Sequence, residues 1–322
     1  MDTEIKKQLI LPIELAGLRV DQALSQLLPE YSRSRITQWL RSQQITLDGE
    51  TVRPKDKIKG GEQVSIQAVI EVVCESQAQA IDLTIIYEDD DLLIINKPAG
   101  LVVHPAAGHP QNTLVNALLH HHTALNRLPR AGIIHRLDKD TTGLLMVAKT
   151  LTAHTVLVSM MQQRQISREY IAIVQGAIIS GSTIDAPIGR HPRQRVKMAV
   201  VSNGKPAMTH YRLIERFQRH SVVRVMLETG RTHQIRVHFA HIHHPIVGDP
   251  VYGGRLQLPK QCSPELAFAL TNMKRQALHA QHLRLEHPKT GKKLEFTAPI
   301  ADDLQLLIKC LQDNESKSKT MY

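Results

Sequence analysis

The sequence predicts an α+β fold in which a mixed, mostly antiparallel β-sheet forms a large domain behind a small α/β domain. Three observations predict it. Short apolar runs of strand-like composition recur through residues 83–296, and turn residues separate them. The connections between these runs are mostly short, whereas parallel pairing would need crossovers of about a dozen residues or more. Helical spacing of apolar residues is limited to a few segments, two of which lie before residue 42.

Composition shifts divide the chain into four parts. We expect an N-terminal extension at residues 1–16, a small domain at 17–76, a large domain at 77–312 and a flexible polar tail at 313–322. The linker between the domains is placed at residues 69–82, where glycine is absent and Ser, Gln and Ala cluster. Its length and polarity predict a small domain that swings relative to the large one.

Two helices are predicted in the small domain, each with an apolar stripe at helical spacing. The stripe of the first consists of Val20, Leu24, Leu27 and Leu28. The stripe of the second consists of Ile36, Trp39 and Leu40. Pro29 separates the two helices, and Asp21 suits the positive end of the first helix dipole. Short strands around residues 45–47 and 63–66 follow, with turns at 48–49 and 60–61.

The large domain is predicted to begin at residue 83 with two apolar runs that flank an acidic turn and form an antiparallel strand pair. Residues 197–217 are interpreted as one hairpin around an Asn203-Gly204 turn. Further strands are expected at residues 168–176, 221–228 and, as a pair around a turn at 289–291, at 277–296. Helices are expected at residues 115–119, 232–242 and 304–311.

The stretch from Gly132 to Thr150, GIIHRLDKDTTGLLMVAKT, organises the chain. It places Arg136 and Asp138 in a polar turn between two apolar runs, which is typical of a loop that precedes a buried strand. A carboxylate at such a junction can lie at the floor of a cleft. Local chemistry alone favours a salt-bridged turn without further function.

The segment HRLDKDTTGLLMVAKT resembles the active-site signature of the RluA class of RNA pseudouridine synthases. Four other stretches agree with that class in its order: LLIINKPAGLVVHP from Leu92, SREYIAIVQG from Ser167, GKPAMTHY from Gly204 and ETGRTHQIRVHFAHIHHPIVGDPVYG from Glu228. The resemblance covers nearly the whole chain. It implies the pseudouridine synthase fold and the isomerisation of uridine to pseudouridine. Within that class, the chain most resembles a type that acts on large-subunit ribosomal RNA. This implies that its partner is such RNA, free or in a pre-ribosomal particle.

The same resemblance assigns roles to four residues. Asp138 falls on the family's catalytic aspartate, which acts either as a nucleophile or by drawing off a proton. Tyr170 falls on the active-site tyrosine, which could stack on the uracil, and Arg231 is implied to be the guanidinium that compensates the buried charge of Asp138. Arg136 is the candidate for filling the gap left when the uridine leaves its stack. Local grounds alone would make Tyr170 a core residue and Arg231 a surface arginine.

The segment YSRSRITQWLRSQQITLDGETV, from Tyr31, resembles an S4 RNA-binding domain. The resemblance implies that a set of basic residues follows an RNA phosphate backbone. This set consists of Arg33, Arg35 and Arg41, with Lys55 and Lys57. The alternative is a solvated basic helix face, which charge runs usually form.

The composition indicates the kind of partner. A net charge of +10 favours a polyanion, because neutralising phosphates supplies much of the affinity for nucleic acid. Aromatic residues make up only 3% of the chain, which argues against broad base-stacking surfaces. No apolar run approaches the roughly 18 residues of a membrane span, and the N-terminus lacks a signal-peptide pattern. We therefore expect a cytoplasmic protein without membrane contact and, because no coiled-coil pattern is present, a monomer.

No cofactor and no metal are expected. The isomerisation implied by the resemblance involves no redox change. Histidines are abundant, with runs at residues 120–122 and 238–244, but the zinc-binding pattern HExxH is absent. Cys74, Cys262 and Cys310 form no CxxC pair, which argues against both a zinc ribbon and a disulfide framework.

Three alternatives stay open at this point. A non-catalytic assembly factor that binds ribosomal RNA would keep the fold and lose the reaction, although Asp138, Tyr170 and Arg231 all stand at their motif positions. A base-releasing glycosidase would use two carboxylates, and only Asp138 has a matched position. A related type of pseudouridine synthase, with the same small domain, would act on ribosomal RNA but modify different uridines.

Overall fold

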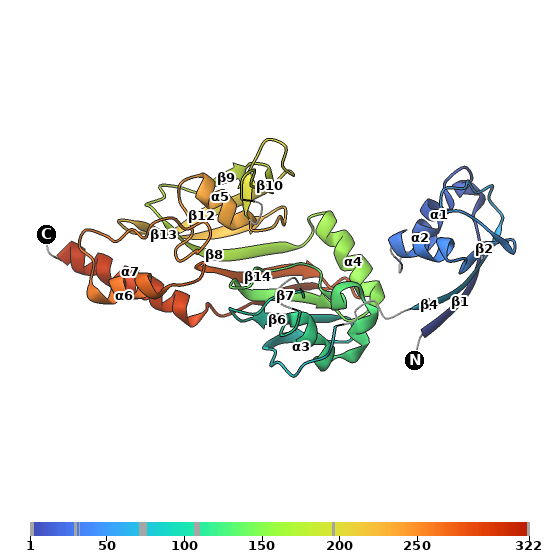
Figure 1. The fold of residues 1–322 in the computed structure, drawn as a ribbon, viewed down its shortest axis with the longest axis horizontal. Helices are drawn as coiled ribbons and strands as arrows, with labels where there is room; N and C mark the ends of the chain where they lie inside the picture. The colour runs from blue at the N-terminus through green and yellow to red at the C-terminus, as the bar shows by residue number, and fades with distance from the viewer. Residues whose placement is uncertain are drawn as a thin grey trace.

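The computed structural model describes residues 3–28, 31, 33–70, 76–105, 110–194 and 197–320. Figure 1 shows a small N-terminal domain at one end of an elongated molecule and the C-terminal helix at the other end. Between them lies the large domain, which is built on one long, twisted sheet with helices on both of its faces. The α+β class with a mostly antiparallel sheet and a small N-terminal domain agrees with the prediction.

The small domain is a four-stranded sheet covered by two helices. The sheet has the order β1-β4-β2-β3, formed by β1 (Thr3–Ile10), β4 (Gln63–Ile70), β2 (Ile45–Leu47) and β3 (Glu50–Thr51). A short 3-10 helix, η1 (Ile13–Leu15), follows β1, and the covering helices are α1 (Val20–Leu27) and α2 (Arg33–Arg41). The predicted apolar stripes of both helices lie in the core, where Leu24, Ile36 and Trp39 are buried.

The turn between β2 and β3 also agrees with its prediction. Asp48 and Gly49 both have positive φ angles, 49° and 81°, and this left-handed pair makes the tight hairpin turn that an Asp-Gly sequence favours. The expected N-terminal extension is wrong for the described residues, because Thr3–Ile10 pairs antiparallel with the whole of β4, from Thr3 opposite Ile70 to Ile10 opposite Gln63. Ile5 and Leu9 pack against the core of the small domain, but Lys6, Lys7 and Gln8 between them hide this strand face in the sequence.

The large domain contains a nine-stranded sheet among the described residues. Along the sheet the order is β5-β6-β7-β14-β8-β13-β12-β9, and β15 pairs with β14. These strands are β5 (Ile85–Glu88), β6 (Leu92–Lys97), β7 (Thr142–Ala148), β8 (Ser167–Gln175), β9 (Ser182–Asp185), β12 (Met208–Arg216), β13 (His220–Leu227), β14 (Leu278–Glu286) and β15 (Lys293–Thr297). Every pairing in it is antiparallel except that of β7 with β14, so the mostly antiparallel mixed sheet is confirmed.

Strand β7 is the buried strand predicted after the Asp138 loop. All seven of its residues are buried, because both faces of the sheet are covered at this point. Leu145 and Val147 enter the larger core on one face, and Leu144 and Met146 enter a second core on the other. A strand packed on both sides gives the loop that precedes it a fixed base.

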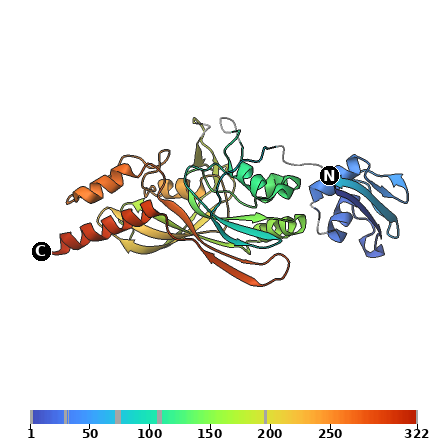
Figure 2. The same cartoon turned by 90° about the horizontal axis from the view of Figure 1, so that it is seen from below.

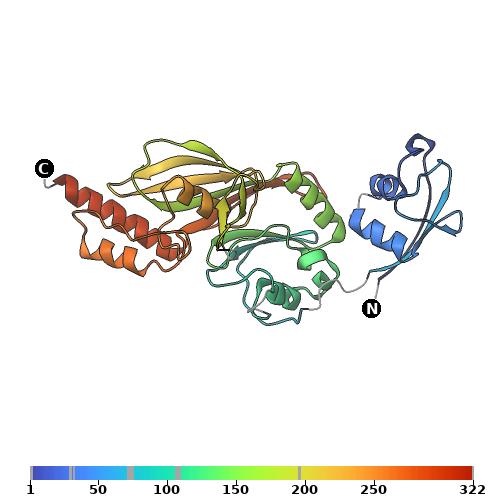
Figure 3. The same cartoon turned by 45° about the horizontal axis from the view of Figure 1, so that its top comes forward.

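Six helical segments complete the large domain up to residue 272. They are α3 (Leu114–His121), η2 (Thr123–Arg127), η3 (Pro129–Gly132), α4 (Leu151–Gln162), α5 (Gln234–His241) and α6 (Pro264–Asn272). Helices α3 and α5 were predicted, and Thr113 is the N-cap of α3. Helix α4 was not predicted. Figure 3 shows it at the end of the large domain that faces the small domain, on the side of α2.

The final helix, α7 (Asp302–Thr320), corrects another prediction. Residues 313–320 continue the helix instead of forming a flexible polar tail. Asn314 is buried, and its Oδ1 accepts a hydrogen bond of 2.8 Å from the backbone N–H of Ser263 at the start of α6. Figure 2 shows α7 alongside α6 at the C-terminal end of the molecule. Helix α6 thus packs against α7, and its contact with Asn314 lies beyond residues 304–311, on which the prediction of this helix rested.

The hairpin predicted at residues 197–217 is wrong. Strand β11 (Met198–Val200) pairs with β10 (Ile188–Arg190), and β12 pairs instead with β9 and β13. A turn does occur before Gly204, but the chain after it returns along Ile188, which bridges Lys205. A Cβ at Gly204 would lie 2.7 Å from the backbone of Ile188, so glycine is what permits this close approach.

Part of the predicted linker is attached to the large domain. Residues 63–70 still belong to β4, and residues 71–75 lie outside the described ranges. From residue 76 onward the chain has no regular structure but is bound to α3: Asn116 Nδ2 donates to the Gln77 carbonyl at 2.7 Å, and Gln79 N–H donates to the Asn116 carbonyl at 3.0 Å. The described half of the linker is therefore anchored.

Candidate active site

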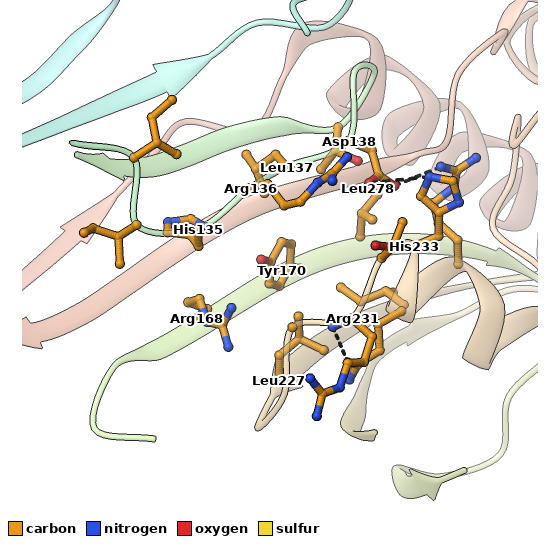
Figure 4. A pocket seen from close by; sticks show the side chains of 18 of the residues that line it. His135, Arg136, Leu137, Asp138, Arg168, Tyr170, Leu227, Arg231, His233 and Leu278 are labelled. Atoms are coloured by element: carbon orange, nitrogen blue, oxygen red, sulfur yellow. Dashed lines mark hydrogen bonds and ion pairs between the residues drawn. The ribbon is translucent and has the colours of Figure 1, made fainter. Parts of the chain in front are cut away.

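A cleft of about 640 Å³ opens beside the loop that precedes β7. Its walls come from residues 133–138, from β8 and from the segment that leads into α5, three parts of the chain that are distant in sequence. Figure 4 shows Asp138, Tyr170 and Arg168 in one row along this cleft, with Arg231 and His233 opposite. The structure thus brings together all four residues that the sequence predicted for the site, because Arg136 lines the same cleft.

The Asp138 carboxylate lies at the inner end of the cleft with 16% of its side chain exposed. Its Oδ2 accepts a hydrogen bond of 2.8 Å from Arg236 Nη1. Its Oδ1 lies 3.9 Å from His233 Nε2. One carboxylate oxygen is therefore held by a guanidinium, while the other has no hydrogen bond of ordinary length to a described residue.

The predicted pairing of Arg231 with Asp138 is wrong. Arg231 is exposed, and its Nε donates to the Pro206 carbonyl at 3.1 Å. It stands in the turn before α5, whereas Arg236 lies within the helix and extends from it into the cleft. The two arginines are five residues apart in TGRTHQIR, and only the position of the helix decides which one reaches the carboxylate.

Arg236 connects two carboxylates. Its Nε and Nη2 form a bidentate pair with Asp249 at 2.7 and 2.9 Å, while Nη1 binds Asp138. Its guanidinium carbon also lies 5.1 Å from the centre of the Tyr252 ring, which suits a cation–π contact. Burial alone would lower the pKa of Arg236, but hydrogen bonds and charges from Asp249 and Asp138 outweigh it and raise that pKa. Arg236 therefore remains a cation in the buried site.

Asp249 anchors this arginine from below. Its side chain is fully buried, and its Oδ1 accepts the backbone N–H groups of Val251 at 2.8 Å and Tyr252 at 3.0 Å. Burial would raise the pKa of Asp249, but Arg236 and these two N–H groups lower it. Sequence analysis missed both Arg236 and Asp249, although both lie inside a quoted motif.

Lys97 holds the Asp138 loop from the sheet side. It stands at the end of β6 and is fully buried, and its Nζ donates to the carbonyls of Pro98 at 2.7 Å, Leu101 at 2.9 Å and Lys139 at 2.8 Å. Burial lowers the pKa of Lys97 to about 7, although the charges of Asp140 and Asp138 oppose this shift. The bond to the Lys139 carbonyl fixes the residue next to Asp138.

Tyr170 lies on β8 and forms part of the cleft wall with only 4% exposure. In Figure 4 it lies between Arg168 and Asp138. Burial raises the pKa of its phenol, and the charge of Asp138 adds to this rise while Arg168 opposes it. The phenol is therefore neutral at ordinary pH.

His233 closes the cleft on the α5 side. It has a left-handed backbone, with φ of 56°, at the N-terminus of α5. Its Nδ1 lies 2.9 Å from the Tyr252 hydroxyl. Burial lowers the pKa of His233, although the negative charge of Asp138 opposes this shift.

Arg136 lies on the open side of the same cleft. It is exposed, and no salt bridge joins it to Asp138 or Asp140. The local salt bridge considered from the sequence is therefore not formed in the part of the chain that the structure describes. An exposed arginine two residues before Asp138 is free to reach toward a ligand in the cleft.

The predicted RNA-binding residues of the small domain differ in their surroundings. Arg33 is bound to the buried Asp21, with Nη2 at 2.7 Å, and Arg19 binds the same carboxylate. Burial would raise the pKa of Asp21, but Arg33 and Arg19 lower it. Arg33 thus connects α2 to α1 and has a structural role as well.

The remaining basic residues of the predicted set are distributed over two surfaces. Arg41, Lys55 and Lys57 are exposed. Arg35 is half-buried on α2, close enough to His154 of α4 that its charge adds to the lowering of that residue's pKa. Burial is the main cause, and together with Arg35 and Arg130 it brings the pKa of His154 to about 4. Arg130 lines the cleft, so cations extend from α2 toward the active site.

Among the described residues, no group of three or more His, Cys, Asp and Glu side chains is arranged to hold a metal ion. Within the same ranges, no helix combines the length and apolar character of a membrane span.

Comparison with known families gives two matches. Residues 91–241 match the RNA pseudouridylate synthase family, and residues 18–64 match the S4 domain family. The first range contains Asp138, Tyr170, Arg231 and Arg236, and the second contains α1 and α2.

Three curated proteins named ribosomal large subunit pseudouridine synthase D are similar over most of their length. The one from Pseudomonas aeruginosa is 54% identical over 317 residues, which cover 98% of this chain and 99% of that protein. The Escherichia coli protein is 53% identical and covers 94% and 93%, respectively. The Xanthomonas campestris protein is 52% identical and covers 97% and 94%.

Solved structures give a more distant likeness. Human RNA pseudouridylate synthase domain containing 4 superposes with a TM-score of 0.55 at 26% identity, and the match covers 71% of this chain and 93% of that one. Human RNA pseudouridylate synthase domain containing 1 gives a TM-score of 0.53 at 26% identity, with coverage of 73% and 96%.

Proposed function

This chain belongs to the family of RNA pseudouridine synthases, and from that membership we propose that it converts uridine to pseudouridine in large-subunit ribosomal RNA. The observation that carries the proposal is the cleft itself. It holds one carboxylate, Asp138, beside the ring of Tyr170, and a buried arginine fixes that carboxylate. Its volume of about 640 Å³ is within the usual range for a small-molecule site and suits a nucleotide that has left its stack.

The reaction is an isomerisation within one nucleotide. The bond from N1 of uracil to C1′ of the ribose breaks, the uracil turns, and C5 bonds to C1′. The proton on C5 is then lost and N1 gains one, so no other reactant is consumed. We propose Asp138 as the carboxylate that assists the first step, either as a nucleophile or by drawing off a proton.

The contacts of Asp138 support this role. Arg236 binds Oδ2 and supplies a counter-charge in a site that is mostly closed to water. Oδ1 is left to face the ligand, and His233 beside it marks the edge of the space. Because Arg236 is itself fixed by Asp249, the carboxylate is positioned before the substrate arrives.

We further propose that Tyr170 stacks on the uracil and that Arg136 fills the gap left in the RNA stack. Tyr170 presents a buried ring next to Asp138, and Arg136 is exposed at the open side of the cleft. Arg231, which also lines the cleft, is proposed to contact the RNA backbone instead of Asp138. In the small domain, Arg35 and Arg41 are the proposed phosphate contacts, and Arg33 joins them while it binds Asp21. We also propose that the protein acts on ribosomal RNA in the cytoplasm and that it does so as a monomer.

Pseudouridine mapping tests the proposal. Unmodified large-subunit ribosomal RNA is incubated with the natural protein and with Asp138→Asn, and RNA binding is measured for both. The natural protein should modify particular uridines, and the variant should bind equally well without modifying any, because the amide keeps the shape but loses the charge.

Each alternative gives a different result. If both proteins bind and neither modifies any ribosomal RNA, free or assembled, the protein is a binding factor. Release of free uracil would indicate a glycosidase. A different set of modified uridines from that of the D-type relatives would indicate a sister specificity.

A further inference from the structure

Arg168 is a buried arginine that the proposed function does not use. It stands two residues before Tyr170 on β8, so the two side chains lie on the same face of the strand. It lines the cleft and is only 8% exposed. Figure 4 places it in the same row as Tyr170 and Asp138, on the side of Tyr170 away from Asp138.

This guanidinium has no counter-ion in the described part of the chain. Its buried Nε has no hydrogen-bond partner there, and no salt bridge joins it to a described carboxylate. The neighbouring Glu169 points to the other face of the sheet and pairs with Arg284 at 2.8 Å and Arg224 at 3.6 Å. An isolated buried charge is costly, so a protein that keeps one usually has an anion to receive there.

The surroundings of Arg168 are shaped to hold it in place. Gly230 lies directly against it, because a Cβ there would stand 3.2 Å from Arg168 Nη1. His135 lies near it, close enough that the positive charge of Arg168 adds to the effect of burial, and the pKa of His135 is lowered to about 3. A larger residue at position 230 would move the guanidinium away from this position.

His135 adds a second donor without an acceptor. Its Nε2 accepts a hydrogen bond of 3.2 Å from the Met146 N–H, so in the neutral ring Nδ1 carries the proton. This Nδ1 is buried and has no partner among the described residues. Two buried N–H donors of residues that line the cleft, Arg168 Nε and His135 Nδ1, thus have no acceptor among the described residues.

We propose that Arg168 binds a backbone phosphate of the RNA, the one adjoining the target uridine, and thereby positions that nucleotide along the cleft. This inference rests on the proposed function. RNA supplies anions only at its phosphates, whereas the uracil offers neutral carbonyls. Two strand residues span about 6.6 Å, so with the uracil against Tyr170 its own phosphate falls near Arg168. Arg236 cannot take this role because Asp138 and Asp249 already occupy it.

The test pairs a protein change with a single-atom change in the RNA. Short substrate RNAs carry a neutral methylphosphonate in place of either phosphate adjoining the target uridine. Their kcat/KM is compared with that of the unmodified RNA for the natural protein, Arg168→Gln and Arg168→Lys. Arg224→Gln is the matched control, because Arg224 lies on the neighbouring strand β13 and is exposed.

In the natural protein, neutralising one of the two phosphates should lower kcat/KM by roughly tenfold to a hundredfold, as expected for a charge-assisted hydrogen bond. Arg168→Gln should show that loss already with the unmodified RNA and no further loss with the neutral one. Arg168→Lys should keep part of the effect, and Arg224→Gln should keep all of it. The proposal would be overturned if each methylphosphonate lowered kcat/KM by the same factor in Arg168→Gln as it does in the natural protein.

A measurement without RNA separates this role from a structural one. Replacing a buried charge that lacks a counter-ion should stabilise the free protein, so Arg168→Met should raise the Tm while it lowers kcat/KM. A clear fall in Tm would show that Arg168 supports the fold and would overturn the proposal. The natural protein with unmodified RNA tests the proposed function separately: pseudouridine formation there keeps that function intact even if Arg168 proves to bind no phosphate.

Discussion

Single residues decide whether the active site is pre-formed, and Arg236 is the one on which most contacts converge. It satisfies two carboxylates and stacks over Tyr252 with 5% of its side chain exposed. Arg231, five residues earlier, is exposed and has one side-chain bond to a backbone carbonyl. The two arginines therefore provide a natural comparison.

Replacing Arg236 with alanine should lower the free energy of unfolding by about 3–5 kcal/mol, because the fully buried Asp249 loses its counter-charge. Pseudouridine formation should fall by about a hundredfold or more, since Asp138 loses its positioning contact. Arg231→Ala should cost less than about 1 kcal/mol. Chemical denaturation and single-turnover assays of both variants check this. Equal destabilisation by the two changes would contradict the assignment of Arg236 to the carboxylates.

Lys97 should make the free energy of unfolding depend on pH. Its pKa is lowered to about 7 in the folded protein, so between pH 7 and its ordinary value the unfolded chain binds more protons than the folded one. Stability from this group is therefore lowest below pH 7 and rises with pH above it. From pH 7 to 9 the free energy of unfolding of the natural protein should rise by about 2 kcal/mol relative to Lys97→Met. Urea titrations at several pH values measure this difference, and parallel pH curves for the two proteins would show that Lys97 is not desolvated.

At the scale of elements, the sequence predicts those segments whose periodicity matches their burial. The stripes of α1 and α2 and the apolar run of β7 are such cases. Helix α4 escaped because Val156, Val158 and Met161 spread its apolar residues around the helix, which removes the stripe. The hairpin at 197–217 was misplaced because a local turn cannot show which strand the chain will pair with next.

The site shows the same limit. Asp138, Tyr170 and Arg136 could be placed in one cleft through motif resemblance, and the structure brings them together. The partner of Asp138 could not, because the choice between Arg231 and Arg236 depends on where α5 begins. Arg168 had no signal in the sequence, since nothing local reveals that a charge will be buried without a counter-ion.

Helix α7 offers a test of element packing. Asn314→Ala should lower the free energy of unfolding by about 1–3 kcal/mol, because the Ser263 N–H at the start of α6 loses its acceptor. Asp313→Ala, one residue away and exposed, should change stability by no more than about 0.5 kcal/mol. Thermal unfolding of both variants checks the contrast. If the two variants unfold alike, residues beyond 312 do not pack as the structure describes.

At the scale of the whole molecule, two domains divide the work between binding and chemistry. The small domain presents Arg35 on the side of α2 that faces α4, and Arg130 continues the cationic surface into the cleft. RNA that enters the cleft can thus remain in contact with positive charge as it leaves toward the small domain.

Arg35→Gln and Arg41→Gln should each weaken RNA binding and reduce the slope of log affinity against log salt by about 0.7–0.9, the value for one phosphate contact. The rate of pseudouridine formation at saturating RNA should not change, since neither residue reaches the cleft. Arg216→Gln, exposed at the far end of β12, is the control for net charge. Salt titrations of binding give the slopes, and a variant whose slope equals that of the natural protein makes no phosphate contact through the replaced arginine.

The single parallel pairing described in the large sheet, between β7 and β14, is where the strands β5-β6-β7 connect to the rest of that sheet. Strands β7 and β14 share only two paired positions, His279 with Thr142 and Ala280 with Gly143. A Cβ at Gly143 would lie 2.2 Å from the Ala280 carbonyl oxygen, so the backbones of β7 and β14 are in direct contact there and leave no room for a side chain. Asp138 precedes β7 on one side of this contact, whereas Tyr170 lies on β8, which pairs with the other edge of β14. A methyl group at Gly143 would have to push β7 away from β14, so we expect Gly143→Ala to increase the distance between Asp138 and Tyr170 and to slow catalysis.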